Sequence, residues 1–314
     1  MAANPCGKGD YAFSLKPYER LYPFNGSWYK NNGLCQHYID VGSGDPMVMV
    51  HGNPSWSFYY RRLAERFLKE YRVLVPDHIG MGRSEKPDDS EYDFTLKRRI
   101  DDLERLMKKA GVEKNVTLVV HDWGGYIGIG WALRKPSRIS RIVILNTAAF
   151  RMPRGMKLPW QLWVVKNVPG VSDIAVRGFD AFAGLATKMA VEKPMPENVK
   201  RGFLAPYNNW KNRLAVLRFV QDIALKPSDE SYKEFKRIDR NLERLRDKPM
   251  LICWGLKDFV FNKRMLREWT DRFPLAKVKR FKDGGHYILE DKPKEIISEM
   301  EEFFTKNPMG GKKK

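Results

Sequence analysis

The sequence predicts an α/β protein with a mostly parallel central sheet, flanked by helices and interrupted by an inserted helical cap. Between residues 36 and 150, short β-rich runs alternate with longer amphipathic segments, which is the order expected of βαβ units. The β-rich runs are apolar at nearly every position, as expected for strands that are covered on both faces. A proline-rich stretch without strand pattern then precedes two further strands.

Six short segments are predicted to be strands, and two longer segments are predicted to be helices. Along Lys97–Ala110 the apolar residues, such as Ile100, Leu103 and Met107, recur at helical spacing, so this segment is predicted to pack on the sheet. A closing helix is predicted over Lys294–Phe304. The predicted strands are Pro46–Val50, Arg72–Val75, Val116–Val120, Arg141–Leu145, Pro249–Trp254 and Lys277–Phe281.

The stretch 151–240 is predicted to be an insertion into a single domain. Prolines divide it into short helical pieces rich in Trp, Phe and Met. We therefore expect an α/β core formed by residues 1–150 and 241–314, and a helical cap formed by residues 151–240. The apolar segments 158–171 and 179–185 fit either of two roles, lining a tunnel for an alkyl substrate or seating the cap on the core.

Charge and apolar content restrict the partners. The 314 residues carry 57 Lys and Arg against 38 Asp and Glu, a net charge of +19. These charges are spread along the chain, because residues 151–240 alone hold 17 basic and 9 acidic residues, and only Lys312 to Lys314 form a run. This distribution argues against a nucleic acid or an anionic membrane as partner. No apolar run approaches 18 residues and no export signal is evident, so we expect no membrane span and a cytoplasmic location.

Cysteine content indicates neither a disulfide framework nor a zinc site. Cys6, Cys35 and Cys253 are an odd number at wide spacing, with no CxxC pair and no neighbouring histidine. A reducing compartment is therefore expected.

Asp122 is the predicted nucleophile. The strand VTLVV runs into HDWGG and then into a helical segment, which is the strand–turn–helix setting of the nucleophile elbow in the α/β-hydrolase fold. Gly124 would permit the close approach of the chain there. Val120 replaces the usual first Gly, and the chain contains no G-x-S-x-G motif, so a serine esterase is not expected. By itself, Asp122 could equally be a helix N-cap.

Asp258 and His286 complete a predicted triad. His286 follows the last predicted strand and Asp258 follows the strand before it, which gives the order nucleophile, acid, histidine that this fold requires. The other position for the acid, after the strand that precedes the insertion, holds Asn146, which cannot stabilise an imidazolium by charge. Asp258 is therefore the predicted acid.

Asn53 and Trp123 are predicted to bind a leaving anion. The HGNP segment follows a strand at the position that supplies one backbone N–H of the oxyanion hole, and the residue after the nucleophile supplies the other. Both residues also carry side-chain N–H donors. Each alone could be structural, as a turn Asn and a packed Trp.

A carboxylate nucleophile suits displacement of a halide from an sp³ carbon. A serine would form an ether, whereas Asp122 forms an ester that water, deprotonated by His286, can hydrolyse. This chemistry needs no metal and no organic cofactor. The expected partners are a small apolar substrate and a halide ion.

At this point the sequence resembles the haloalkane dehalogenase family. The blocks HGNPSWSFYYRRL, VPDHIGMGRSEKP, VVHDWGG, ILNTAAF, CWGLKDFVF and GGHYILED carry the resemblance over most of residues 20–305. It implies the triad Asp122, Asp258 and His286 and the halide donors Asn53 and Trp123. The combination of an Asn and one Trp with an acid after the later strand is similar to the pattern of the third subfamily. Members of that subfamily often form large oligomers, so the resemblance implies a homo-oligomer.

Three alternatives to the dehalogenase remain open. The chain also resembles the β-lactone decarboxylases of bacterial long-chain olefin biosynthesis, through APYNNW, RFVQDI and VILNTAAF. An epoxide hydrolase would need cap tyrosines, for which Tyr207 and Tyr232 are candidates. A ligand-binding protein of the same fold, without turnover, is the third alternative.

Overall fold

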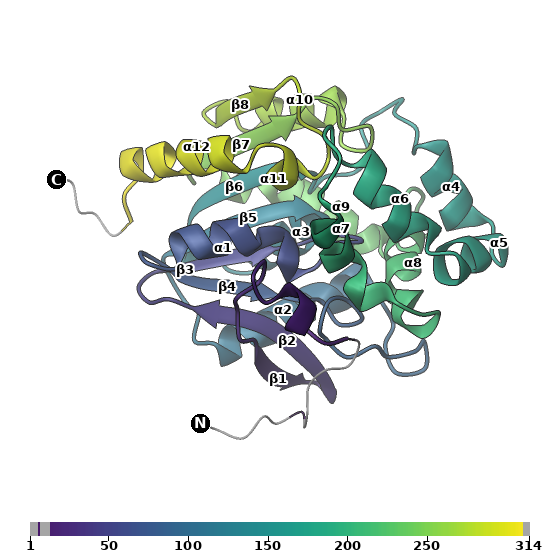
Figure 1. The fold of residues 1–314 in the computed structure, drawn as a ribbon. Coiled ribbons are helices and arrows are strands. Elements are labelled where there is room, and N and C mark those ends of the chain that lie inside the picture. The colour runs from purple at the N-terminus through teal and green to yellow at the C-terminus, as the bar shows by residue number, and fades with distance from the viewer. Residues whose placement is uncertain (1–5, 7–12, 310–314) are drawn as a thin grey trace.

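The computed structural model describes Cys6 and residues 13–309, and the described chain forms one sheet of eight strands (Figure 1). The strands are β1 Ser27–Asn31, β2 Leu34–Val41, β3 Pro46–Val50, β4 Arg72–Pro76, β5 Val116–Asp122, β6 Ile139–Thr147, β7 Met250–Gly255 and β8 Lys277–Phe281. Their order across the sheet is β1-β2-β4-β3-β5-β6-β7-β8. The pairs β1–β2 and β2–β4 are antiparallel, and all other neighbours are parallel. The predicted α/β-hydrolase fold is confirmed.

The first two strands form a hairpin that the sequence analysis did not predict. Asn32 and Gly33 connect them with positive φ angles of 49° and 93°, as in a tight hairpin turn. β1 lies at the edge of the sheet and is only partly buried, so it lacks the continuous apolar run that identified the inner strands. All six predicted strands are present. β4 is one residue and β5 two residues longer than predicted, and β6 extends two residues further at each end.

Two groups of helices pack against the sheet. One group contains α1 Arg61–Phe67, α11 Ile288–Asp291 and α12 Pro293–Lys306, in which α1 and α11 each contact α12. The other contains α2 Leu96–Lys109, α3 Trp123–Ala132 and α9 Tyr232–Asn241. The remaining core helix is α10 Lys263–Arg272, and single turns of 3₁₀ helix occur at η1 Lys16–Tyr18, η2 Ser57–Tyr60, η3 Pro136–Arg138, η5 Ala205–Tyr207, η6 Lys211–Arg213 and η7 Leu242–Leu245.

Between β6 and α9 the described chain is mainly helical and lies beyond the carboxyl ends of the central strands (Figure 1). Before α9, this inserted segment contains α4 Trp160–Asn167, α5 Val171–Asp173, the π-helical turn η4 Ile174–Gly178, α6 Ala181–Met189, α7 Glu197–Leu204 and α8 Leu214–Gln221. α9 contacts α2 and α3, so the last residues of the predicted cap lie against core helices.

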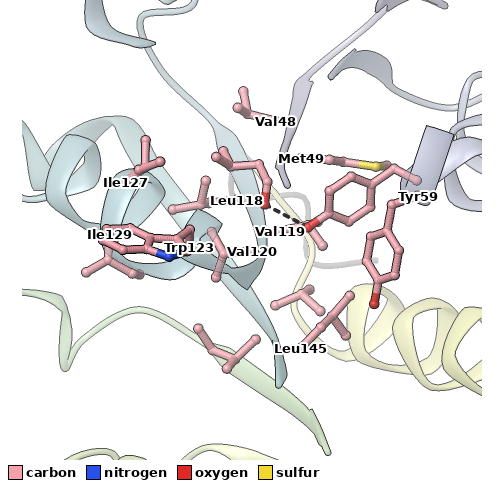
Figure 2. Close-up of a cluster of buried hydrophobic side chains, with 14 of the residues drawn as sticks. Val48, Met49, Tyr59, Leu118, Val119, Val120, Trp123, Ile127, Ile129 and Leu145 are labelled. Atoms are coloured by element: carbon pink, nitrogen blue, oxygen red, sulfur yellow. Dashed lines mark hydrogen bonds between the residues drawn. The ribbon is translucent and has the colours of Figure 1, made fainter. Parts of the chain in front are cut away.

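The core beneath the elbow is built from the two central strands and α3 (Figure 2). Val48 and Met49 of β3, Leu118 of β5 and Ile127 and Ile129 of α3 are fully buried. Burial of each such side chain contributes about 1.5–3 kcal/mol. This packing holds the end of β5 and the start of α3 in fixed relative positions.

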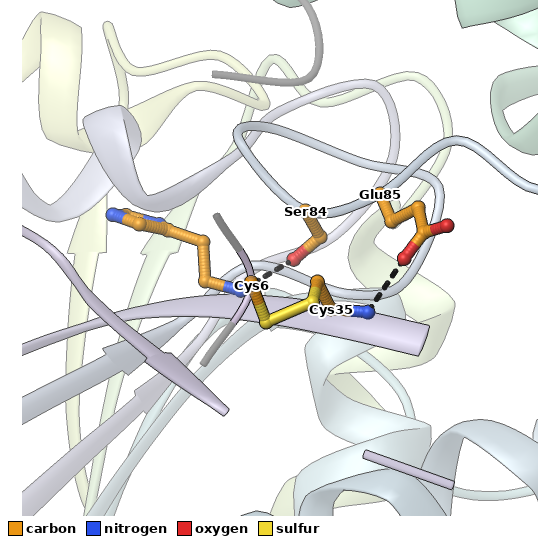
Figure 3. The surroundings of a disulfide bond; sticks show 5 residues. Cys6, Cys35, Ser84 and Glu85 are labelled. Atoms are coloured by element: carbon orange, nitrogen blue, oxygen red, sulfur yellow. Dashed lines mark hydrogen bonds between the residues drawn. A yellow bond between two sulfur atoms is a disulfide. The ribbon is translucent and has the colours of Figure 1, made fainter. Parts of the chain in front are cut away.

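The cysteines differ from the prediction. Cys6 and Cys35 form a disulfide with a Cα–Cα distance of 5.8 Å, at the start of β2 (Figure 3). The prediction of unpaired cysteines was wrong because it relied on spacing, and the chain brings together residues 29 positions apart. Cys253 is free and buried in β7. None of the described helices is long and apolar enough to cross a membrane, and the cytoplasmic location stays a prediction.

Candidate active site

Asp122 occupies a strained turn between β5 and α3. Its φ of 51° and ψ of −127° are unusual for a residue with a side chain, and such strain costs about 1–3 kcal/mol. The backbone oxygen of Asp122 accepts a hydrogen bond from the Thr147 hydroxyl at the end of β6. This geometry is that of a nucleophile elbow, and no helix-capping hydrogen bond comes from the Asp122 side chain.

Two glycines allow the chain to approach this turn. A Cβ atom on Gly124 would lie 1.9 Å from the backbone oxygen of Val50, which confirms the close approach predicted at Gly124. A Cβ atom on Gly52 would lie 2.0 Å from Oδ1 of Asp122. A larger residue at Gly52 would clash with the Asp122 carboxylate, and one at Gly124 would clash with the backbone at the end of β3.

Three groups contact the Asp122 carboxylate. The backbone N–H of Asn53 donates to Oδ1 at 2.6 Å, and the backbone N–H of Trp123 also bonds to the carboxylate. Nε2 of His286 lies 3.7 Å from Oδ2. Burial raises the pKa of the Asp122 carboxyl to about 6, although His286 and the two N–H groups act in the opposite direction. The group is therefore ionised at neutral pH.

His286 is held by Asp258. Nδ1 of His286 lies 2.8 Å from Oδ2 of Asp258, and Oδ1 of Asp258 accepts the backbone N–H groups of Val260 and Phe261 at 2.8 and 2.9 Å. Burial lowers the pKa of His286, but the carboxylates of Asp258 and Asp122 together raise it above its ordinary value. The Phe261 ring stacks on the imidazole at a centroid distance of 5.6 Å.

Asn146 supports the acid, a role that the sequence analysis missed. Its amide nitrogen donates to Oδ2 of Asp258 and to the backbone oxygen of Gly255, both at 3.0 Å. Its amide oxygen accepts the Gly255 N–H at 2.8 Å. The available signal was a polar residue at the end of a mostly buried strand, although in the sequence Asn146 was considered only as an alternative position for the acid.

A cavity of about 180 Å³ opens in front of Asp122. Asn53, Asp122, Trp123 and His286 line it, and Asp258 lies buried behind His286. The other walls are mostly apolar and come from the inserted segment, from the loop after β7 and from α10. They include Met152, Met156, Leu158, Leu162, Phe182, Leu185, Met189, Ile223, Phe235, Phe259 and Met265.

Two side-chain donors face this cavity. The indole of Trp123 has no hydrogen-bond partner among the described residues, and its ring packs edge-on against Phe219 at a centroid distance of 5.3 Å. The amide of Asn53 donates one N–H to the backbone oxygen of Val216 at 3.0 Å, which leaves its second N–H for an anion. All five predicted site residues therefore come together.

The tyrosines predicted for an epoxide hydrolase lie elsewhere. Neither Tyr207 nor Tyr232 lines the cavity. Tyr207 is fully buried, and its hydroxyl donates to the backbone oxygen of Ser55. Tyr126 does line the cavity, but its hydroxyl donates to the backbone oxygen of Phe150 at 3.1 Å. The structure thus gives no support to the epoxide hydrolase alternative.

The chain belongs to the α/β-hydrolase fold family, whose model matches residues 45–293. It is 50% identical over 288 residues to a cis-3-alkyl-4-alkyloxetan-2-one decarboxylase of Shewanella oneidensis, a match that covers 91% of this chain and 90% of that one. It is 27% identical over 304 residues to haloalkane dehalogenase 2 of Mycobacterium tuberculosis, covering 93% and 99%.

Solved structures agree on the fold. The haloalkane dehalogenase DatA from Agrobacterium tumefaciens C58 superimposes with a TM-score of 0.80 at 24% identity, covering 90% of this chain and 96% of that one. The resemblance to haloalkane dehalogenases is confirmed. The decarboxylase resemblance is the stronger of the two in sequence, so the preference for a dehalogenase over a decarboxylase is not supported.

Proposed function

We propose that this protein decarboxylates a cis-β-lactone with two alkyl chains, an oxetan-2-one substituted at C3 and C4, to an alkene and carbon dioxide. The observation that carries the proposal is the 50% identity to a decarboxylase over 91% of the chain, against 27% to a dehalogenase. The apolar cavity in front of Asp122 suits a substrate whose alkyl chains must be desolvated. In this proposal, residues 151–240 act as the cap over the site.

The first step is displacement at C4 of the lactone by Asp122. Oδ2 of Asp122 attacks this sp³ carbon, the bond from C4 to the ring oxygen breaks, and the electron pair leaves with that oxygen as a carboxylate on C3. This is the same kind of displacement as halide release. The free N–H groups of Asn53 and Trp123 stabilise the new anion, a type of contact in which each donor contributes about 2.7–4 kcal/mol.

The second step releases both products. The bond from C3 to the carboxylate breaks, its electrons form the C3=C4 double bond, and the bond from C4 to Asp122 breaks to restore the Asp122 carboxylate. Inversion at C4 places the Asp122 oxygen opposite the carboxylate, so an anti elimination retains the cis relation of the alkyl chains. Atoms and charges balance without water.

His286 and Asp258 have an electrostatic role in this sequence. His286 lies 3.7 Å from the attacking oxygen and lowers the pKa of Asp122 relative to burial alone. Asp258 fixes the imidazole through the 2.8 Å contact at Nδ1. Neither step needs a proton transfer by His286.

Haloalkane dehalogenation is the second candidate, favoured by the paired donors. The partner-free indole of Trp123 and the second amide N–H of Asn53 also suit a halide. In this reaction the Asp122 ester must be hydrolysed by water that His286 deprotonates, with the backbone N–H groups of Asn53 and Trp123 holding the oxyanion.

Isotope labelling with two substrates separates the candidates. The protein is incubated in ¹⁸O-water with a long-chain cis-β-lactone or with a 1-bromoalkane, and the peptide containing Asp122 is weighed. We expect alkene from the lactone and no label in Asp122, because water is not used. Label in Asp122 together with bromide release, and no alkene from the lactone, would make the protein a dehalogenase.

A further inference from the structure

The outer surface of the inserted helices carries an unusual number of exposed apolar side chains. Eight of the eleven large hydrophobic residues that the described structure exposes most lie between residues 160 and 210. Phe179 is 80% exposed and Trp160 is 72% exposed. We define the apolar face as Trp160, Trp163, Val171, Ile174, Phe179, Leu185, Met189 and Trp210.

These side chains belong to helices that pack on one another in sequence. α4 contacts α5, α5 contacts η4, and η4 contacts α6. Trp210 joins them through Arg177, whose guanidinium lies 4.4 Å from the indole centroid. Figure 1 shows α4, α5 and α6 on the side of the molecule farthest from β1 and β8. A surface of this kind on a soluble fold marks an interaction site.

Charge on and beside the apolar face is positive. Residues 151–190 contain six Lys and Arg and two Asp. The two acids are neutralised, since Asp173 pairs with Arg177 and Asp180 pairs with Arg213. Three exposed cations nearby, at positions 154, 157 and 188, have no ion pair in the described part of the chain. The surface therefore combines exposed tryptophans with uncompensated positive charge.

The apolar face is continuous with the substrate cavity. Leu185 and Met189 line the cavity and are also about half exposed, at 51% and 50%. On α4, Pro159 and Leu162 line the cavity while Trp160 and Trp163 point to solvent. An apolar molecule could therefore pass from this surface into the cavity without crossing open water.

We propose that the apolar face docks on an anionic lipid bilayer and that apolar substrate enters the cavity from the membrane. Tryptophans favour the bilayer interface, and each Lys or Arg near anionic lipid strengthens binding about five-fold. A second copy of this chain fits less well, because a two-fold contact would bring Arg154, Lys157 and Lys188 against one another. The entry of a lipid-soluble substrate rests on the proposed function, but docking itself does not.

Vesicle co-sedimentation tests the docking. The full chain is mixed with vesicles of phosphatidylethanolamine and phosphatidylglycerol, or of phosphatidylcholine alone. We expect binding to the anionic vesicles that weakens with salt. The variant Trp160→Ser/Trp163→Ser/Phe179→Ser should bind at least about ten-fold less tightly. Leu275→Ser, at a 93% exposed residue between α10 and β8, is the matched control and should bind like the wild type.

Two kinds of result would contradict docking on the membrane. Absence of wild-type binding, or equal binding by the triple serine variant, would overturn the proposal. So would a triple variant that only converts an oligomer to a monomer in size-exclusion chromatography, since the apolar face would then join copies of this chain.

Entry of the substrate from the membrane is measured in a separate experiment. A long-chain cis-β-lactone is supplied either in anionic vesicles or in detergent micelles. The triple serine variant should keep its micellar rate and lose at least about ten-fold in the vesicle rate. Equal losses of rate with vesicles and with micelles would contradict entry from the membrane. If the wild type turned over the lactone in neither assay, the proposed function would be contradicted, but the result of the vesicle binding experiment would not be affected.

Discussion

The backbone N–H of Asn53 lies 2.6 Å from Oδ1 of Asp122, and His286 faces the other oxygen, Oδ2. The two oxygens are thereby made inequivalent before substrate binds. In the proposed mechanism, Oδ1 lies in the oxyanion hole and becomes the carbonyl oxygen of the ester. Oδ2 is the oxygen free to attack.

Asp122→Ala should lose at least about 10⁴-fold in turnover of any substrate, because no other group can form the covalent intermediate. Asp122→Asn is the matched control, since it keeps the size of the side chain and should be equally inactive. Rates are measured by alkene or bromide release. Residual turnover of Asp122→Asn near the wild-type rate would show that the carboxylate is not the nucleophile.

His286→Phe should separate the two chemistries. With a bromoalkane it should accumulate an alkyl ester on Asp122, visible as a mass increase of that peptide, because the water-activating base is missing. With a cis-β-lactone it should still produce alkene, with its pH dependence shifted upward, since His286 lowers the pKa of Asp122. Complete loss of alkene would show that His286 transfers a proton in the reaction.

The pH profile should have an acid limb near pH 6. Burial raises the pKa of Asp122 to about 6, and only the ionised form attacks, so kcat/KM should fall ten-fold for each pH unit below this value. At higher pH the rate of lactone decarboxylation should not change with pH. The rate of bromoalkane turnover should continue to increase as the pH rises past the pKa of His286, because only neutral His286 activates water. That pKa is raised above its ordinary value. A profile without the acid limb would exclude Asp122 as the titrating nucleophile.

Asn53→Ala and Trp123→Phe should each lose about 2.7–4 kcal/mol of transition-state stabilisation, because each removes one donor to the departing anion. Bromide binding, followed by tryptophan fluorescence, should weaken in both. Trp160→Phe is the control, since this indole is exposed and does not line the cavity. If Asn53→Ala keeps its bromide affinity, the side-chain amide does not contact the anion.

Asn146→Ala should lower the stability by about 1–3 kcal/mol, because the buried N–H of Gly255 and the Asp258 carboxylate each lose a partner. Denaturant unfolding measures the loss. The variant should keep its acid limb near pH 6, since Asn146 does not contact Asp122. A shift of that limb would place Asn146 in direct communication with the nucleophile.

The inner sheet and the site residues could be predicted because their signals are local. Buried parallel strands are continuous apolar runs, and the residues that follow them lie at one edge of the sheet. The hairpin of β1 and β2 was missed because an edge strand such as Ser27–Asn31 is only partly buried. The disulfide of Cys6 and Cys35 was missed because it depends on a long-range contact.

The orientation of the inserted helices could not be predicted either. Along Trp160–Asn167 nearly all sides are apolar, so periodicity does not show that Leu162 faces the cavity and Trp163 faces solvent. The sequence also does not show which basic residues of this segment, such as Arg154, Lys157 and Lys188, have no ion pair in the described part of the chain. The proposed docking on an anionic bilayer departs from the expectation drawn from the charge distribution, and vesicle binding decides between the two.

The hydrogen bond between Asn146 and Asp258 joins the ends of β6 and β7, the two places from which a carboxylate can reach the same imidazole. A double substitution that exchanges Asn146 and Asp258 would leave the His286 imidazole in place and would keep one amide and one carboxylate in the pair. During divergence, the acid can thus migrate from one strand to the next while the base stays still. The position of the acid could therefore change without any movement of the nucleophile or the base.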